Sequence, residues 1–348
     1  NLKVEWVFEL QGLPVPVVDH NIGREQFSAV ALFLQSASRV DRKFQLTPDI
    51  APEIVRICQL VGGLPLGIEL AAAWVQVLPC AEIRQEIERN LDFLATTMRD
   101  VAPRHRDLRA VFEYSWKALT PSEQVAFQQL AVFADSFTAE AADAVAGVKY
   151  IDLLSLINKS LLQPLNEKLG AASSAPLQRR YQIHQALYQY ANEKLAAASV
   201  TQHELRNRHC AYYSHFVYMQ EKQLKSSGVA QALAAIGAEI ENIRASWRHA
   251  VSHLWIDCLE QSVQGMMRFY LLHGPLQEAQ MAIDTIMDKI SALVAESGQA
   301  LPQVQRFLGK LMAVKAEFLN ERGLYDQAIT AAQNAIQLAQ NNQAIEDE

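Results

Sequence analysis

With 348 residues, half of them hydrophobic, the chain is too long for one ordinary hydrophobic core, and we expect two or three folded domains. Its net charge of −7, with charged residues of both signs making up 20%, argues against broad electrostatic attraction to nucleic acid or to an anionic membrane. No apolar run reaches the roughly 18 uncharged residues that a membrane span needs, no signal peptide opens the chain, and the four cysteines show no CxxC pair. We therefore expect a soluble cytoplasmic protein with reduced thiols.

The first residues predict a single β-strand that leaves a sheet. Apolar and polar side chains alternate from Val4 to Leu10, and Pro14 and Pro16 follow. Because one strand cannot satisfy its own backbone, the rest of that sheet must lie elsewhere. The chain begins with Asn1 rather than methionine, so we expect it to be part of a longer product.

Helical periodicity takes over at Arg24 and predicts a small helical bundle. In the segment TPDIAPEIVRICQLVGG, Thr47–Pro48 predicts a helix start and Gly62–Gly63 predicts the end of that helix. Pro65 follows at once and predicts the start of the next helix. A further helix is predicted in CAEIRQEIERNLDFLATTM.

The next region combines helix caps with a predicted hairpin. Thr120 precedes Pro121 and an acidic first turn, and Thr138 stands in the same position before Ala139. Two β-prone pieces, SLLQPL and RRYQIHQ, flank the polar and small residues 166–178. Helices followed by such a hairpin are typical of a winged helix, with GAASSAP as the flexible tip of the wing.

From about Thr201 onward the sequence predicts helices alone, and two segments share one spacing pattern. The two sets, offset by 49 residues, are Gly274, Leu276, Ala279, Ile283, Ile286 and Gly323, Tyr325, Ala328, Ala332, Ala335. Small residues at such positions let paired helices approach closely. Because the offset exceeds the roughly 34 residues of a standard tetratricopeptide repeat, we predict a tetratricopeptide-like superhelix with long helices.

The sequence carries little catalytic chemistry. It contains no GxxxxGK[ST] phosphate loop, and the three histidines at 203, 209 and 215 lack cysteine or carboxylate partners at ligand spacing, so we predict no metal site. A DNA-reading winged helix should carry clustered lysine and arginine, yet PSEQVAFQQLAVFADSFTAEAADAVAGV contains neither. We therefore expect no direct contact with nucleic acid.

Several segments together resemble a known family. ICQLVGGLPLGIELAAAW, RHRDLRAVFEYSWKALTPSEQVAFQQLAVFADSFTAEAADAV, LINKSLLQ, RYQIHQALYQYANEKL and EIENIRASWRHAV follow one another as in bacterial STAND signal-transduction ATPases. More narrowly, the chain resembles the NB-ARC type found in large bacterial transcriptional regulators.

The resemblance implies a mainly α fold made of a helical bundle, a winged helix and a TPR-like α-superhelix, with one residual N-terminal strand. The implied domains are a terminal strand and linker of a truncated nucleotide-binding domain (1–23), a helical ARC1-like domain (24–103), a winged-helix ARC2-like domain (104–200) and a TPR-like helical repeat domain (201–348).

The GLPL motif of that family matches Gly63, Leu64, Pro65 and Leu66. The resemblance implies that the proline packs against the adenine ring of a bound nucleotide. A proline ring with fixed φ offers a flat apolar surface at little entropic cost, and neighbouring glycines let the backbone come close to a base. The residues alone also allow the simpler interpretation that Pro65 begins a helix after a glycine stop.

The MHD motif of the family matches Ile183, His184 and Gln185. The resemblance implies that the histidine reaches the β-phosphate of ADP and ties the winged helix to a closed resting state. An imidazole can donate a hydrogen bond to a phosphate oxygen. Gln185 stands where the family has aspartate and cannot supply its negative charge. Alternatively, His184 is an interior histidine at a strand end.

The implied function is the regulatory part of an ADP/ATP-dependent signal-transduction switch, in which the helical and winged-helix domains clamp ADP and the repeats sense a protein or small-molecule inducer. We also expect self-oligomerisation on activation. We expect no membrane partner. Magnesium and the triphosphate would be held by the missing nucleotide-binding domain. Because this chain lacks the Walker A and Walker B motifs, we expect it to be inactive as an ATPase on its own. The alternative is a nucleotide-independent TPR-like protein-interaction scaffold.

Overall fold

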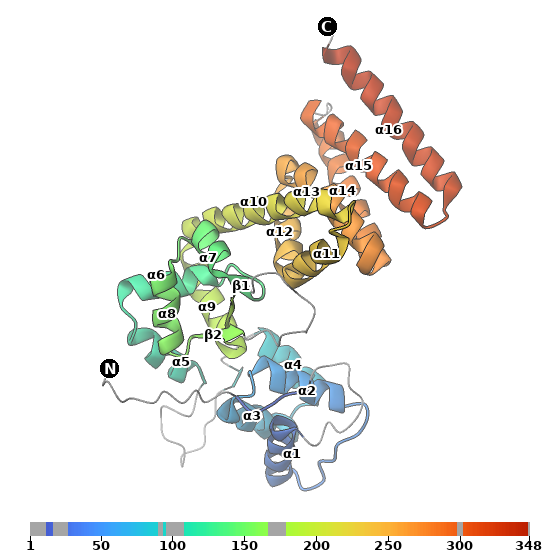
Figure 1. Ribbon diagram of the computed structural model, residues 1–348. Helices are drawn as coiled ribbons and strands as arrows, with labels where there is room; N and C mark the ends of the chain where they lie inside the picture. The colour runs from blue at the N-terminus through green and yellow to red at the C-terminus, as the bar shows by residue number, and fades with distance from the viewer. Residues whose placement is uncertain are drawn as a thin grey trace. The chain divides into compact units, whose positions relative to one another are not determined.

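Figure 1 shows the computed structural model, which describes residues 12–16, 27–89, 93–94, 108–165, 179–297 and 302–346. These residues form helices α1 to α16, a short 3-10 helix η2 and three short strands, which confirms the predicted mainly α fold. The predicted strand from Val4 to Leu10 lies outside the described residues. None of the described helices is both long and apolar enough to cross a membrane.

The chain divides into two compact units. The first contains Asn1–Ala131 and Lys149–Ser199, and the second contains Val132–Val148 and Val200–Glu348. The piece Val132–Val148 therefore interrupts the first unit in sequence and belongs to the second in space. The four-part domain division given above remains a prediction.

The first unit begins with a small group of helices, drawn in blue in Figure 1. They are α1 (Ser28–Val40), α2 (Ala51–Leu60), α3 (Pro65–Ala72), η2 (Ala73–Gln76) and α4 (Cys80–Arg89). Helix α1 packs on α3, and α2 packs on α4. The fully buried side chains of Phe33, Ile54 and Ile68 form the core of this group. Between α2 and α4, Arg84 forms an ion pair with Glu53 at 2.6 Å.

The predicted start of α2 at Thr47–Pro48 is wrong, because the helix begins at Ala51. The Thr47 carbonyl accepts the amides of Ile50 and Ala51, so one turn forms before the helix. Pro52 has no N–H to continue this series of bonds, and the regular helix can start only at that point. The start of α2 is therefore set by Pro52 and not by the Thr47–Pro48 signal.

The remainder of the first unit contains helices and a hairpin. Its elements are α5 (Leu108–Lys117), α6 (Pro121–Leu130), α8 (Tyr150–Asn158), β2 (Leu162–Leu165), β3 (Arg180–Ile183) and α9 (Gln185–Ala197). The predicted N-cap at Thr120 is confirmed: it forms a capping box with Glu123. The predicted hairpin is confirmed too, since β2 pairs with β3 antiparallel and Leu162 lies opposite Ile183. The predicted tip, within residues 166–178, lies outside the described residues.

The second unit is helical apart from one two-residue strand. Its elements are β1 (Phe137–Thr138), α7 (Ala139–Ala146), α10 (Ser199–Leu224), α11 (Val229–Ala238), α12 (Ile240–His253), α13 (Ile256–His273), α14 (Leu276–Ser297), α15 (Pro302–Glu321) and α16 (Tyr325–Glu346). Thr138 accepts the Ala141 amide and caps α7, as predicted. The buried side chain of Asn242 joins α12 to the interrupting piece, because it accepts the Ala134 amide and donates to the Ser136 carbonyl.

Two successive helical hairpins, α13 with α14 and α15 with α16, correspond to the predicted repeat. Helices α14 and α16 both have 22 residues, and they begin at Leu276 and Tyr325, the predicted offset of 49. Helices α15 and α16 pack against each other and are drawn in red tones in Figure 1. Their equal length and fixed spacing support one repeated helical unit, while the comparison with tetratricopeptide repeats stays a prediction.

Candidate functional site

The corner between α2 and α3 is a left-handed turn made by two glycines. Gly62 and Gly63 have φ of +62° and +66°. The Gly63 amide donates to the Cys58 carbonyl at 2.9 Å, and the Gly62 amide donates to the Gln59 carbonyl at 2.8 Å. This pair of bonds is the Schellman motif, which satisfies carbonyls at a helix end and favours glycine in the left-handed conformation. The predicted end of α2 at these glycines is therefore confirmed.

Helix α3 starts directly after this corner, as predicted, with Pro65 as its first residue. Leu64 is extended, with ψ of 121°, and its carbonyl accepts the Ile68 amide at 3.0 Å, the first bond of the helix. Pro65 is exposed, whereas Leu64 and Leu66 are half-buried. The proline ring is thus held at a rigid helix start with a surface that a ligand can reach.

A second Gly-Leu-Pro tripeptide lies against the first. The Leu13 amide donates to the Gly63 carbonyl at 2.8 Å, and a Cβ atom placed on Gly63 would lie 2.9 Å from the Leu13 nitrogen. Further along, the Gln59 side-chain amide donates to the Pro16 carbonyl at 3.0 Å. Residues 12–16 therefore lie along the α2–α3 corner. Because Gly63 has no side chain, the backbone of Leu13 can pack closely against it.

His184 lies at the junction between strand β3 and helix α9. Its carbonyl accepts the amides of Leu187 at 2.8 Å and Tyr188 at 3.2 Å, so the backbone of this residue opens α9. Its imidazole lies against Gly62: a Cβ atom placed on that glycine would lie 2.9 Å from Nδ1 and 3.2 Å from Nε2. Burial lowers the pKa of His184, which favours the neutral imidazole at pH 7.

The structure thus brings part of the predicted site together. The histidine touches the glycine that immediately precedes the Gly63–Leu66 motif, and both belong to the first unit. The nucleotide-binding roles of Gly63, Leu64, Pro65, Leu66 and His184 remain a prediction. Sequence reasoning missed the role of Leu13, and the signal that could have revealed it is the repeated Gly-Leu-Pro tripeptide.

The predicted histidine series on α10 is divided between surface and core. His203 and His215 are exposed, while His209 is buried. In the part of the chain that the structure describes, no three histidine, cysteine, aspartate or glutamate side chains gather as a metal site would require.

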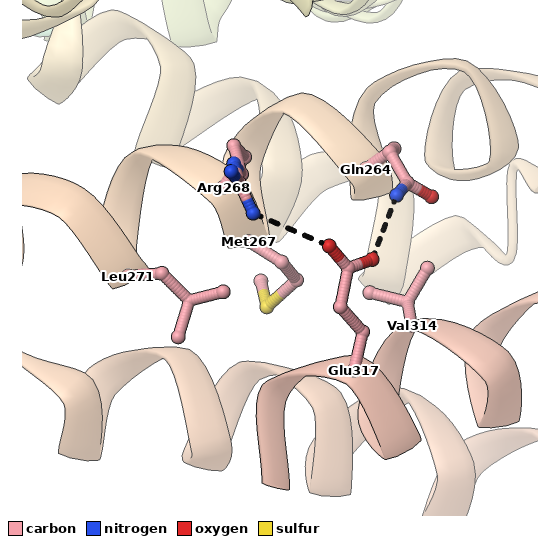
Figure 2. Close-up of a pocket in the computed structure, with 6 residues that line it drawn as sticks. All are labelled: Gln264, Met267, Arg268, Leu271, Val314 and Glu317. Carbon is pink, nitrogen blue, oxygen red and sulfur yellow. Dashed lines mark hydrogen bonds and ion pairs between the residues drawn. The ribbon is translucent and has the colours of Figure 1, made fainter. Parts of the chain in front are cut away.

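A small hollow in the second unit lies between α13 and α15. Figure 2 shows its lining residues, Gln264, Met267, Arg268, Leu271, Val314 and Glu317. Glu317 accepts from Gln264 at 3.1 Å and forms an ion pair with Arg268 at 3.4 Å. The space inside the hollow measures about 10 Å³, which is enough for roughly one water molecule. Both Gln264 and Arg268 bind the Glu317 carboxylate, and we assign the hollow no ligand.

Comparison with known proteins finds relatives among mycobacterial regulators. The chain is 30% identical over 228 residues to a protein of Mycobacterium tuberculosis named "Putative HTH-type transcriptional regulator Rv0890c", and equally to its counterpart Mb0914c in Mycobacterium bovis. The match covers 65% of this chain and 25% of each regulator. It is also 32% identical over 117 residues to "Uncharacterized protein Rv0894" of M. tuberculosis, covering 34% of this chain and 30% of that protein.

The chain therefore spans about a quarter of the length of the regulators that it matches. No protein-family model matches the chain. No solved structure matches it significantly.

Proposed function

We propose that this chain is the regulatory part of a nucleotide-dependent switch in a transcriptional regulator. One observation carries the proposal: the imidazole of His184 lies against Gly62, at the turn that leads into the Gly63–Leu66 motif. The two motifs that the resemblance assigns to ADP are far apart in sequence and adjacent in the first unit. The names of the mycobacterial relatives support the transcriptional role.

The residues at this corner fit an adenine nucleotide. Pro65 is exposed at a rigid helix start, and an apolar ring of fixed geometry suits the face of a base. His184 is half-buried, and its neutral imidazole retains one N–H that can donate to a phosphate oxygen. Bound ADP would supply the phosphate charge that links the two. The side chains of this corner would bind and orient the nucleotide, and hydrolysis is assigned to a domain that carries a phosphate loop.

A switch of this kind requires ADP to bind the closed arrangement more tightly than the open one. His184 opens helix α9 through its carbonyl and contacts Gly62 through its ring. A ligand bonded to the ring would therefore stabilise the contact between the β3–α9 junction and the α2–α3 corner. A protein or small molecule that engages the helical repeats would favour the open state and ADP release.

The proposal is tested in the natural gene product that contains this chain. The proposal requires that this gene product also carries a phosphate-loop domain. We expect His184→Ala to release a fluorescent ADP analogue at least tenfold faster than the unchanged protein. His215→Ala is the matched control, because that histidine is exposed on α10 in the second unit. Equal release rates in the two variants, or a gene product without any phosphate loop, would overturn the proposal.

A nucleotide-independent scaffold is the second candidate, and the repeated hairpins of α13 to α16 favour it. Stacked helical hairpins are well suited to protein capture. If the gene product binds its partner with the same affinity whether or not ADP is present, the scaffold function replaces the switch.

A further inference from the structure

Helix α13 packs closely on helix α10 within the second unit (Figure 1). A Cβ atom placed on Gly265 of α13 would lie 2.6 Å from Cγ1 and 3.0 Å from the carbonyl oxygen of Val217 on α10. The glycine therefore lets the two helix backbones come close to each other. One turn earlier on α13, the side-chain nitrogen of Gln261 lies 3.3 Å from Nδ1 of His215 on α10. The two helices thus share a line of contacts.

Two cysteines meet on the same line of contacts. Cys210 of α10 and Cys258 of α13 stand seven residues before Val217 and Gly265, which is about two helical turns. Because both pairs have the same offset of 48 residues, the two helices run in the same direction and keep one register. The Cys210 thiol donates a hydrogen bond to the Cys258 sulfur. The fold therefore brings two thiols into contact from helices that are far apart in the sequence.

Polar groups surround the two sulfur atoms. The Ser246 carbonyl oxygen lies 3.6 Å from the Cys210 sulfur, and the Ser246 hydroxyl donates to the Cys210 carbonyl at 3.2 Å. The buried Ser214 hydroxyl bonds to both sulfurs. A cysteine in apolar surroundings is inert, whereas hydrogen bonds donated to a sulfur stabilise its thiolate. The surroundings of this pair therefore favour thiolate chemistry.

The two thiols are not equivalent. Cys258 stands in the first turn of α13, which begins at Ile256, and the free amides of a first turn stabilise a thiolate. Cys258 is 9% exposed, whereas Cys210 is 0% exposed, so a small solute reaches Cys258 first. The hydrogen bonds from Cys210 and Ser214 lower the pKa of Cys258 to about 7, against the effects of burial and of Asp257. The same bond to Cys258, together with burial, raises the pKa of Cys210. Cys258 is therefore the nucleophile, and Cys210 remains a thiol at neutral pH.

We propose that Cys210 and Cys258 form an oxidation site at which hydrogen peroxide converts the two thiols into a reversible disulfide between α10 and α13. The Cys258 thiolate attacks one peroxide oxygen, the O–O bond breaks, and hydroxide leaves Cys258 as a sulfenic acid. The Cys210 sulfur then attacks the sulfenic sulfur, so that the S–S bond forms and the S–O bond breaks. The Cys210 proton leaves with that hydroxyl as water, and the first hydroxide takes up the proton that Cys258 had lost. The two thiols give up two electrons, and one peroxide becomes two water molecules.

The disulfide joins α10 to α13 two turns away from the close contact at Gly265. Two points then fix the line of contacts between these helices, and the unfolded chain is constrained by a closed loop. Oxidation should therefore stabilise the second unit. The reaction needs no nucleotide and is independent of the function proposed above.

Mass spectrometry of the folded 348-residue chain after treatment with hydrogen peroxide tests the proposal. We expect the chain to lose the mass of two hydrogen atoms, and a non-reducing digest to contain peptides joined through Cys210 and Cys258. Dithiothreitol should reverse both changes. Thermal unfolding should show a midpoint raised by about 5 °C or more in the oxidised chain. A folded chain that keeps its mass under excess peroxide, or a disulfide that forms only in urea, would overturn the proposal.

Single variants test the roles of the two cysteines. In Cys210→Ser, we expect dimedone to trap a sulfenic acid on Cys258, whereas Cys258→Ser should react with peroxide at least tenfold more slowly. The matched control is the double variant Cys58→Ser with Cys80→Ser, which removes the two buried cysteines of the first unit and should form the disulfide at the unchanged rate. Circular dichroism shows whether the helices of each variant are intact. Equal peroxide reactivity of the two single variants, or loss of the disulfide in the control, would contradict the assignment.

Discussion

The imidazole of His184 occupies the space in which a side chain at position 62 would stand, since a Cβ atom placed on Gly62 would come within 2.9 Å of Nδ1. Glycine is therefore favoured at this position for two separate reasons. Its φ of +62° is strained for any residue with a Cβ atom, and the ring leaves no room for one. The contact therefore packs the β3–α9 junction directly against the α2–α3 corner.

Replacement of Gly62 by alanine should destabilise the first unit. The left-handed conformation alone costs about 1–2 kcal/mol, and displacement of the ring adds about 1–3 kcal/mol in the manner of an overpacked core. Urea unfolding measures the sum. Gly147→Ala is the control, because Gly147 has φ of +66° and no atom within 4 Å of its placed Cβ among the described residues, so it should show the conformational cost alone.

The two contributions can be separated by a double-mutant cycle. If the ring is the second cause, combining Gly62→Ala with His184→Ala should restore part of the lost stability. Additive free energies of unfolding would contradict the contact.

The Glu123 carboxylate should make the stability of the first unit depend on pH. Its pKa is lowered to about 2, chiefly by the hydrogen bond from Lys159 and then by those from Ser155 and Thr120. Because the pKa in the folded state lies below that of an unfolded glutamate, the stabilisation is present above pH 4.5 and is lost as the pH falls toward 2. Glu123→Gln should cost about 1 kcal/mol at pH 7, as caps typically do, and almost nothing near pH 2.

The control for this prediction is Glu140→Gln, which removes an exposed first-turn carboxylate from α7. Unfolding is measured in urea from pH 2 to pH 7. A Glu123→Gln penalty that stays constant over this range would show that the carboxylate charge is not the cause.

Local signals in the sequence were enough to predict many helix ends and insufficient for the site contacts. Thr120, Pro65 and the two glycines act within one turn of chain, so their neighbours determine the outcome. The start of α2 was predicted wrongly because Pro52 competed with the earlier Thr47–Pro48 signal. The contact between His184 and Gly62 joins distant segments, and no periodicity within a single helix or strand encodes such a pairing. The resemblance implied only that Pro65 and His184 both face one nucleotide, and it did not predict the contact with Gly62.

His209 should make the second unit sensitive to acid. Burial lowers its pKa to about 3; His249 and Arg206 lower it further, and a hydrogen bond with Asn242 opposes the shift. The unfolded state therefore takes up a proton that the folded state excludes, and stability falls as the pH drops from 6.5 toward 3, by about 1.4 kcal/mol per pH unit. His209→Phe should flatten this dependence, whereas the exposed His203→Phe should leave it unchanged. Tryptophan fluorescence in urea, recorded at several pH values, measures both, and equal slopes would contradict the assignment.

The hydrogen bonds of Asn242 should hold the piece Val132–Val148 against α12. Its side chain accepts the Ala134 amide at 2.9 Å and donates to the Ser136 carbonyl at 2.8 Å. Asn242→Ala leaves both backbone groups without this partner, and each such buried group costs about 1–3 kcal/mol. Hydrogen exchange should then show faster exchange of the Ala134 amide, whereas Asn320→Ala at an exposed position of α15 should not change it. Unchanged protection of Ala134 in the first variant would mean that apolar packing, including the stacked rings of Phe133 and Phe137, holds the piece without the amide.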